Sequence, residues 1–127
     1  MQMVMVMTQV TGCEEIDRQR AEDYCCFAAH KGNIPLSPYL AFHGIFKDEL
    51  GGAVEGILLS RLMEKVDEIW MFGFEQGEAR KKREAAVQKR YGTKARYFSH
   101  PEIGRELLAY AMYSEELIER LEDMEEC

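Results

Sequence analysis

An apolar stretch that ends in a glycine turn constrains the fold of this chain more than any other feature. Residues 66–72 include the apolar run Ile69 to Phe72, Gly73 and Phe74 follow it, and Glu84 lies eleven residues after Gly73 on a predicted helix. A buried strand that leads through a turn into a helix is the unit with which α/β proteins form a pocket at the carboxyl edge of a parallel sheet. The sequence therefore predicts a pocket near Gly73, although no dinucleotide or metal motif marks it.

Predicted strands and helices alternate along the chain. Strands are expected at residues 3–8, 67–72 and 94–98, with a short extended segment at 34–40 that contains two prolines. Helices are expected at residues 14–31, 40–50, 53–65, 78–91 and from 101 onward, with Gly51 and Gly52 separating the second from the third. This alternation predicts an α/β fold, a Rossmann-like three-layer arrangement with a small, mostly parallel sheet and a long C-terminal helix.

Length and composition are those of one soluble domain spanning residues 1–127. No apolar run approaches the roughly 20 residues of a transmembrane helix, so no contact with a membrane is expected. The N-terminus lacks the features of a secretory signal, which predicts a cytoplasmic protein. The four cysteines and three histidines have no metal-binding spacing, and a dinucleotide fingerprint is absent from the sequence, so neither a metal nor a cofactor is expected.

The charge of the chain is unevenly distributed. Its net charge of −7 argues against general binding of nucleic acid. Eight of the sixteen basic residues nevertheless lie between Glu78 and Arg96, whereas residues 115–126 carry seven acids and one arginine. The predicted amphipathic acidic helix at 101–127 has an apolar stripe longer than a domain of this size needs, so we expect a homo-oligomer.

Several motifs occur in an order that resembles a known family. They are Tyr24-Cys25 on the first predicted helix, the segments 32–40 and 67–73, then Glu84, and finally the segment 92–98. This series spans residues 3 to about 99 and resembles small phage and bacterial relatives of the nucleoside 2-deoxyribosyltransferases. The resemblance implies a Rossmann-like sheet with a pocket for a nucleoside or nucleotide.

The resemblance also implies roles for particular residues. Glu84 falls where the glutamate of that family attacks the anomeric carbon of deoxyribose and expels the base. Thr8, Gln9, Thr11 and Gly12 fall where such proteins hold the sugar and base. The family has a glycine-rich turn before its glutamate, but here Glu78 to Arg83 occupy that place and the nearest glycine is Gly77.

The basic run from Arg80 to Arg83 has two interpretations. It is either a solvated helix face or an anion site, because a helix start offers free N–H groups and a favourable dipole. On the second interpretation Arg80 and Lys81 contact a phosphate, and the ligand is a nucleotide. Glu78 is expected to contact the ligand as well. Glu84 has a similar alternative, namely an exposed carboxylate paired along the helix with Arg80 or Gln88.

Other predicted pocket residues are aromatic or lie in the turn. Gly73 and Tyr39 are placed in the pocket, and Phe74 is the best candidate to stack on a base, whereas Trp70 is expected in the core. Three functions remain open at this stage. The chain is an enzyme of N-glycosidic bond transfer or hydrolysis, a non-catalytic protein that senses or sequesters a nucleotide-derived ligand, or an interaction module whose acidic helix binds a partner.

Overall fold

A four-stranded parallel sheet forms the centre of the protein. The computed structural model describes residues 1–45, 49–111, 119 and 122–123, except for the side chains of 49–51 and 110–111. The strands are β1 (Gln2–Thr8), β2 (Asn33–Leu36), β3 (Glu68–Gly73) and β4 (Lys94–Ser99), in the order β2-β1-β3-β4. Every neighbouring pair runs parallel, as the predicted α/β fold requires.

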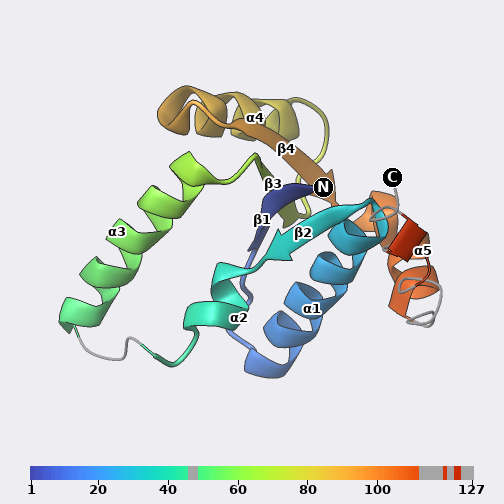
Figure 1. Ribbon diagram of the computed structural model, residues 1–127, viewed down its shortest axis with the longest axis horizontal. Helices are drawn as coiled ribbons and strands as arrows, with labels where there is room; N and C mark the ends of the chain where they lie inside the picture. The colour runs from blue at the N-terminus through green and yellow to red at the C-terminus, as the bar shows by residue number, and fades with distance from the viewer. Residues whose placement is uncertain (46–48, 112–118, 120–121, 124–127) are drawn as a thin grey trace.

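Helices lie on both faces of this sheet and complete three layers (Figure 1). The helices are α1 (Glu14–His30), α2 (Pro38–Phe42), α3 (Glu49–Lys65), α4 (Gly77–Tyr91) and α5 (His100–Ala111). Helices α1 and α5 pack together on one face, and α4 packs against β4 on the other. Figure 1 shows α3 leaving the body of the molecule as an arm.

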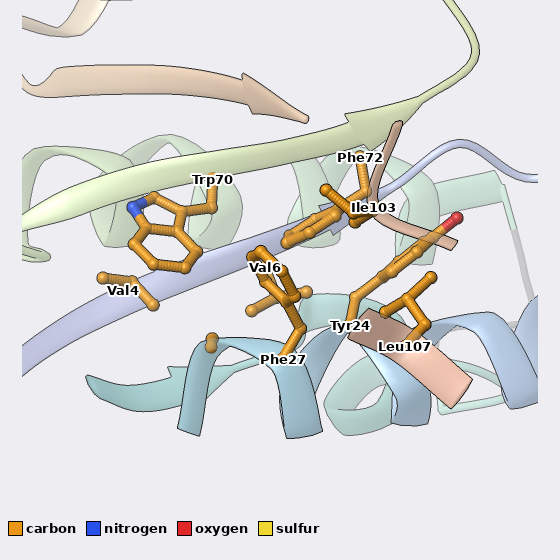
Figure 2. Close-up of a cluster of buried hydrophobic side chains, with 9 residues drawn as sticks. Val4, Val6, Tyr24, Phe27, Trp70, Phe72, Ile103 and Leu107 are labelled. Carbon is orange, nitrogen blue, oxygen red and sulfur yellow. The ribbon is translucent and has the colours of Figure 1, made fainter. Parts of the chain in front are cut away.

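An aromatic cluster forms the core between the sheet and the α1/α5 layer. Its labelled members in Figure 2 are Val4, Val6, Tyr24, Phe27, Trp70, Phe72, Ile103 and Leu107. The Tyr24 and Phe72 rings stack with their centroids 4.3 Å apart. Trp70 is 3% exposed, which confirms the prediction that it belongs to the core. Because successive strand residues face opposite sides, Met5 instead joins Val66, Ile69 and Ala95 in a smaller cluster under α3 and α4.

The predicted break at Gly51 and Gly52 is wrong. Both residues lie inside the continuous helix α3. A glycine in a helix interior costs only about 1 kcal/mol relative to alanine, so the helix-forming residues around the pair prevail.

The segment that follows β2 also differs from the prediction. The extended stretch ends at Leu36, and a short helix α2 begins at Pro38 in place of the helix expected at 40–50. Ser37 caps α2, because its Oγ accepts a hydrogen bond from the Leu40 amide at 3.2 Å. Proline is favoured at the first position of a helix, where its missing N–H is not needed.

The predicted C-terminal helix is described in its first part only. Helix α5 is described from His100 to Ala111, and most of the acidic stretch beyond it lies outside the described residues. Within the described part of the chain, no helix has the length and apolar character needed to cross a membrane.

Candidate functional site

The strand order creates a crevice at the carboxyl ends of β1 and β3. The chain leaves β1 toward α1 on one face of the sheet and leaves β3 toward α4 on the other. Two neighbouring strands whose connections diverge in this way leave a gap at their carboxyl ends, which is where open α/β sheets bind ligands. A hydrogen bond from the Gln9 amide to the Phe72 carbonyl, 3.1 Å long, holds the two strand ends together.

A pocket of about 300 Å³ opens at this edge on the α4 side. Two methionines, Met7 and Met71, supply apolar surface, and the polar side chains belong to Thr8, Gln9, Arg83 and Tyr97; Phe72 completes the lining. A mostly apolar hollow with a few convergent polar groups is the usual form of a small-molecule site, and about 300 Å³ is the lower end of the usual range.

Gly73 allows two of these polar groups to approach the end of β3. A Cβ atom at this position would lie 2.6 Å from Gln9 Oε1 and still closer to Tyr97 Oη. The Tyr97 hydroxyl accepts a hydrogen bond from the Glu75 amide at 3.1 Å, which fixes its position against the turn. Only a residue without a side chain leaves room for this arrangement.

Arg83 reaches the pocket from α4 with its charge already paired. Its Nε and Nη2 donate to the two carboxylate oxygens of Glu75, each at 2.9 Å. This bidentate bond and the charge of Glu75 raise the pKa of the Arg83 guanidinium. Arg80, also on α4, donates from Nη1 to Glu102 Oε2 on α5 at 3.0 Å. Two arginines of the predicted anion site therefore bind carboxylates of the protein itself, while Glu78 and Lys81 are exposed.

Glu84 contacts the outer edge of β4. Its Oε1 accepts a hydrogen bond from the Tyr97 amide at 2.7 Å. One turn further along α4, Gln88 Oε1 accepts from the Ala95 amide at 3.1 Å. These two side chains satisfy N–H groups that an edge strand would otherwise present without partners. Glu84 is half-buried and is not among the residues that line the pocket, but Tyr97 connects the two places through its amide and its ring.

The loop between β1 and α1 is organised around the Asp17 carboxylate. This group accepts hydrogen bonds from the Thr11 amide and the Thr11 hydroxyl, both at 2.8 Å, and from the Gly12 amide at 3.1 Å. Burial opposes ionisation of Asp17, but these hydrogen bonds outweigh it and lower the pKa of the carboxyl. Gly12 has a φ of 93°, a left-handed conformation that favours glycine.

Gly12 and Tyr39 line a different hollow, of about 390 Å³, beside this loop. The Tyr39 ring stacks on the His43 imidazole with the centroids 4.6 Å apart, and His43 Nε2 lies 3.3 Å from a Glu14 carboxylate oxygen. This hollow shares no lining residue with the pocket of Gln9 and Tyr97.

Phe74 lies on the other side of the sheet edge. Its ring is 5.2 Å from the His100 imidazole, and the Arg20 guanidinium lies 4.9 Å from the ring centroid. Phe74 is 41% exposed but does not line the pocket. The structure thus brings Thr8, Gln9 and Gly73 together, and it places the other predicted site residues around them.

Sequence reasoning missed Tyr97, Glu75 and the two methionines of the pocket, and it placed Arg83 in the basic run without assigning it to the pocket. Tyr97 lies on a strand that was correctly expected, and its alternation with Ala95 puts both on the α4 side. Only the strand order shows that this side adjoins Gln9. Among the residues that the structure describes, no group of three or more His, Cys, Asp or Glu side chains is arranged to hold a metal ion.

The fold and the pocket define a small Rossmann-like α/β protein with a ligand-sized hollow at the carboxyl edge of its sheet. Residues 2–98 match the model of a domain of unknown function, DUF7768, and the chain belongs to that family. No curated protein and no solved structure matches the chain.

Proposed function

We propose that the protein binds a nucleoside-type molecule in the pocket of Gln9 and Tyr97. One observation carries this proposal: the side-chain amide of Gln9 and the hydroxyl of Tyr97 meet at Gly73, and two methionines lie beside them. A glutamine amide offers a donor and an acceptor side by side, which matches the edge of a nucleobase. Methionine side chains adapt to a flat ring and make favourable contacts with it.

The charges around the pocket favour an uncharged nucleoside over a nucleotide. Arg83 and Arg80 already pair with Glu75 and Glu102, and the amides of the loop after β1 bind Asp17. A phosphate group would have to displace one of these carboxylates before it could bind either arginine or the amides of Thr11 and Gly12. Binding of a nucleotide through the basic run is therefore tested in the same experiment as binding of a nucleoside.

The proposed reaction is N-glycosidic transfer or hydrolysis with Glu84 as the nucleophile. A Glu84 oxygen attacks C1′ of the sugar, the C–N bond breaks, and the base leaves with the bonding electrons and takes up a proton. Water or a second base then attacks C1′ and releases the glutamate. The Tyr97 amide holds one oxygen of Glu84 next to the residue whose ring lines the pocket.

A second function is binding without turnover. The observation in its favour is the 2.7 Å hydrogen bond that engages Glu84 at the β4 edge, outside the pocket lining. On this alternative Glu84 is a structural residue, and the protein senses or sequesters its ligand.

Mass spectrometry separates the two functions. The protein is incubated with a pooled panel of nucleosides, deoxynucleosides and nucleotides, and both free bases and ligand retained after desalting are measured. Glu84→Gln keeps an oxygen that can accept the Tyr97 hydrogen bond but cannot form the ester. Glu78→Gln, an exposed carboxylate on the same helix, is the matched control.

Each outcome assigns the function. Free base released by the native protein and by Glu78→Gln but not by Glu84→Gln supports the enzyme. Intact ligand retained equally by all three proteins supports the binding protein. Gln9→Ala should weaken retention by at least about tenfold, the value of one good hydrogen bond to a ligand. If neither bases nor a retained ligand are found, the nucleoside proposal is wrong.

We also propose that the protein acts in the cytoplasm as a homo-oligomer. Cys13, Cys25 and Cys26 are free thiols, as is usual in a reducing compartment. Large aliphatic side chains remain exposed on two helices, Ile57 at 63% on α3 and Leu108 at 73% on α5.

A further inference from the structure

A further hollow lies at the edge of the sheet opposite the pocket of Gln9 and Tyr97. Its lining includes Gln2, Asn33 and Glu68, the first residues of β1, β2 and β3, so it lies at the amino ends of the strands. We call it the amino-edge hollow. Its volume is about 460 Å³, within the usual range for a small-molecule site, and it shares no lining residue with the pocket at the carboxyl edge.

Apolar side chains form one wall of the amino-edge hollow. Phe27 from α1, Trp70 from β3 and Ile103 from α5 belong to the core cluster and also line the hollow (Figure 2). Phe98 from β4 extends this wall. Because alternate residues of a strand project to the same face, Glu68 lies on the same side of β3 as Trp70. A ligand in the hollow therefore meets an apolar surface next to a carboxylate.

The Glu68 carboxylate is buried without a strong partner. Its side chain is 9% exposed. Glu68 Oε1 accepts a long hydrogen bond of 3.4 Å from Trp70 Nε1 and lies 3.9 Å from Nζ of Lys94, whose own side chain is 65% exposed. No residue that the structure describes donates a hydrogen bond to Glu68 Oε2. Burial of a carboxylate is unfavourable unless strong hydrogen bonds or an ion pair compensate it, so the hollow lacks a donor that a ligand can supply.

Arg96 provides a positive charge at the exposed rim of the hollow. Its Cζ lies 5.5 Å from the centroid of the Trp70 ring and 5.4 Å from that of the Phe98 ring. Within the described part of the chain, these ring contacts are not accompanied by a carboxylate partner. Stacking on the rings orients the planar guanidinium and leaves its N–H groups able to bind a carboxylate through two hydrogen bonds.

The balance of charge in the hollow indicates the kind of ligand that fits. Its lining carries two positive and two negative side chains, of which Lys31 and Glu106 pair with each other at 3.0 Å. Glu68 and Arg96 are the two without a strong partner. An anion alone leaves Glu68 uncompensated, and a cation alone leaves Arg96 uncompensated. The phosphate of a nucleotide would add a double negative charge beside two carboxylates, whereas a zwitterion satisfies both groups without net charge.

We propose that the amino-edge hollow binds a free amino acid with an apolar side chain. The ammonium group of the ligand donates to Glu68 Oε2, and its carboxylate accepts hydrogen bonds from Arg96. The side chain of the ligand lies against the wall of Phe27, Trp70 and Phe98, where its burial adds to the affinity. The site is separate from the nucleoside pocket, so either one can be present without the other.

The fluorescence of Trp70 tests this site directly, because Trp70 is the one tryptophan of the chain and lines the hollow. L-Phenylalanine or L-leucine is titrated into the full-length protein. Two matched probes each lack one charged group: phenethylamine has no carboxylate, and hydrocinnamate has no ammonium group. We expect a saturable change with the amino acids, and at least about tenfold weaker binding of each matched probe, since it loses a hydrogen bond between charged groups.

Two variants assign the charged groups. Glu68→Gln keeps an acceptor for the Trp70 N–H but removes the negative charge, so it should weaken L-phenylalanine and phenethylamine by at least about tenfold and leave hydrocinnamate unchanged. Arg96→Gln should weaken L-phenylalanine and hydrocinnamate and should not weaken phenethylamine. Glu78→Gln, on the exposed surface of α4, and Gln9→Ala, in the carboxyl-edge pocket, are the controls and should change none of these affinities.

Urea unfolding distinguishes a ligand site from a structural ion pair. If Glu68 serves to pair with Lys94, then Glu68→Gln and Lys94→Gln should both unfold at lower urea concentrations than the native protein. We expect instead that Lys94→Gln is unchanged and that Glu68→Gln unfolds at the same or a higher urea concentration, because it removes a buried charge that lacks a strong partner.

Four results would overturn the proposal. The first is a Trp70 fluorescence that neither amino acid changes up to about 10 mM, a concentration at which even weak specific binding is detected. The second is equal affinity for L-phenylalanine and the two matched probes. The third is unchanged binding in Glu68→Gln together with the loss of stability expected of a structural ion pair. The fourth is tighter binding of adenosine monophosphate than of the amino acids, which would identify a nucleotide site.

Discussion

Substitution of Gly73 by alanine tests how the pocket is built. The backbone at Gly73 has no left-handed φ, so alanine can adopt it without strain. The new methyl group would nevertheless lie 2.6 Å from Gln9 Oε1, closer still to Tyr97 Oη, and 3.0 Å from Tyr97 Cζ. The Gln9 side chain is flexible, but the Tyr97 ring is held by its strand, so the ring must shift and the hydroxyl must leave the Glu75 amide.

The size of the effect follows from three terms. Overpacking a filled site costs about 1–3 kcal/mol, and the lost hydrogen bond costs about 1 kcal/mol. Alanine restricts the unfolded chain and returns about 0.4–1 kcal/mol. The net loss of unfolding free energy is therefore about 2 kcal/mol, which lowers the Tm of a domain of this length by roughly 6–8 °C.

A double-mutant cycle with Tyr97→Phe isolates the hydroxyl. Urea unfolding is measured for the native protein, the two single variants and the double variant. Removing the hydroxyl takes away the nearest obstacle, so Gly73→Ala should cost less than half as much in the Tyr97→Phe background, a coupling of about 1 kcal/mol. An equal cost in both backgrounds, or a cost of Gly73→Ala below about 0.5 kcal/mol, would refute the close approach at Gly73.

Three further outcomes are expected. Glu84→Ala removes the acceptor of the Tyr97 amide and should lower the unfolding free energy by about 1 kcal/mol in urea titrations. Burial lowers the pKa of His100, helped by a nearby arginine, so the folded protein favours the neutral ring, whose Nδ1 lies 2.7 Å from the Tyr24 hydroxyl. Stability is then complete above the ordinary pKa of 6.5 and declines as the pH falls through the lowered pKa, a loss that His100→Asn should reduce. Burial raises the pKa of the Cys25 thiol to about 11, so peptide mapping should find its alkylation slow near neutral pH.

Each outcome has a control. Glu78→Ala, at an exposed position of α4, should leave stability within about 0.5 kcal/mol, and an equal loss there would assign the effect of Glu84→Ala to helix charge. An identical pH dependence of stability in the native protein and in His100→Asn would show that His100 does not cause the loss of stability at low pH. The exposed Cys13 should be alkylated before Cys25, and the reverse order would contradict the burial of Cys25.

The strands and helices that could be predicted from the sequence are those with strong local signals. The apolar runs at β1, β3 and β4 and the glycine stop at Gly92 are local signals, and the elements they predict lie within about two residues of those observed. The prediction for the described part of residues 34–52 was wrong, because a proline can begin a helix as readily as it can end a strand. Two glycines also do not stop a helix whose neighbours favour it.

Some residues of the candidate site could likewise be predicted from the sequence, and others could not. Thr8, Gln9 and Gly73 were expected because each follows a predicted strand, and the ends of parallel strands lie at one edge of a sheet. Phe74 and Tyr39 were expected beside them because of their chain positions, but a side chain at a sheet edge can turn to either face. In the structure the Phe74 ring lies beside His100 and the Tyr39 ring stacks on His43, and neither ring lines the pocket of Gln9.

The sequence by itself determined the alternating elements, the parallel sheet and the edge at which a pocket forms, because these depend on hydrophobic period and turn residues that act over a few positions. Only the tertiary structure decided that β3 lies between β1 and β4, and with it the meeting of Gln9, Gly73 and Tyr97. The same is true of the pairing of Arg83 with Glu75, of the engagement of Glu84 at the β4 edge, and of the exposure of α3. These features depend on which distant segments become neighbours, and that choice follows from the burial of the whole core and not from any local pattern.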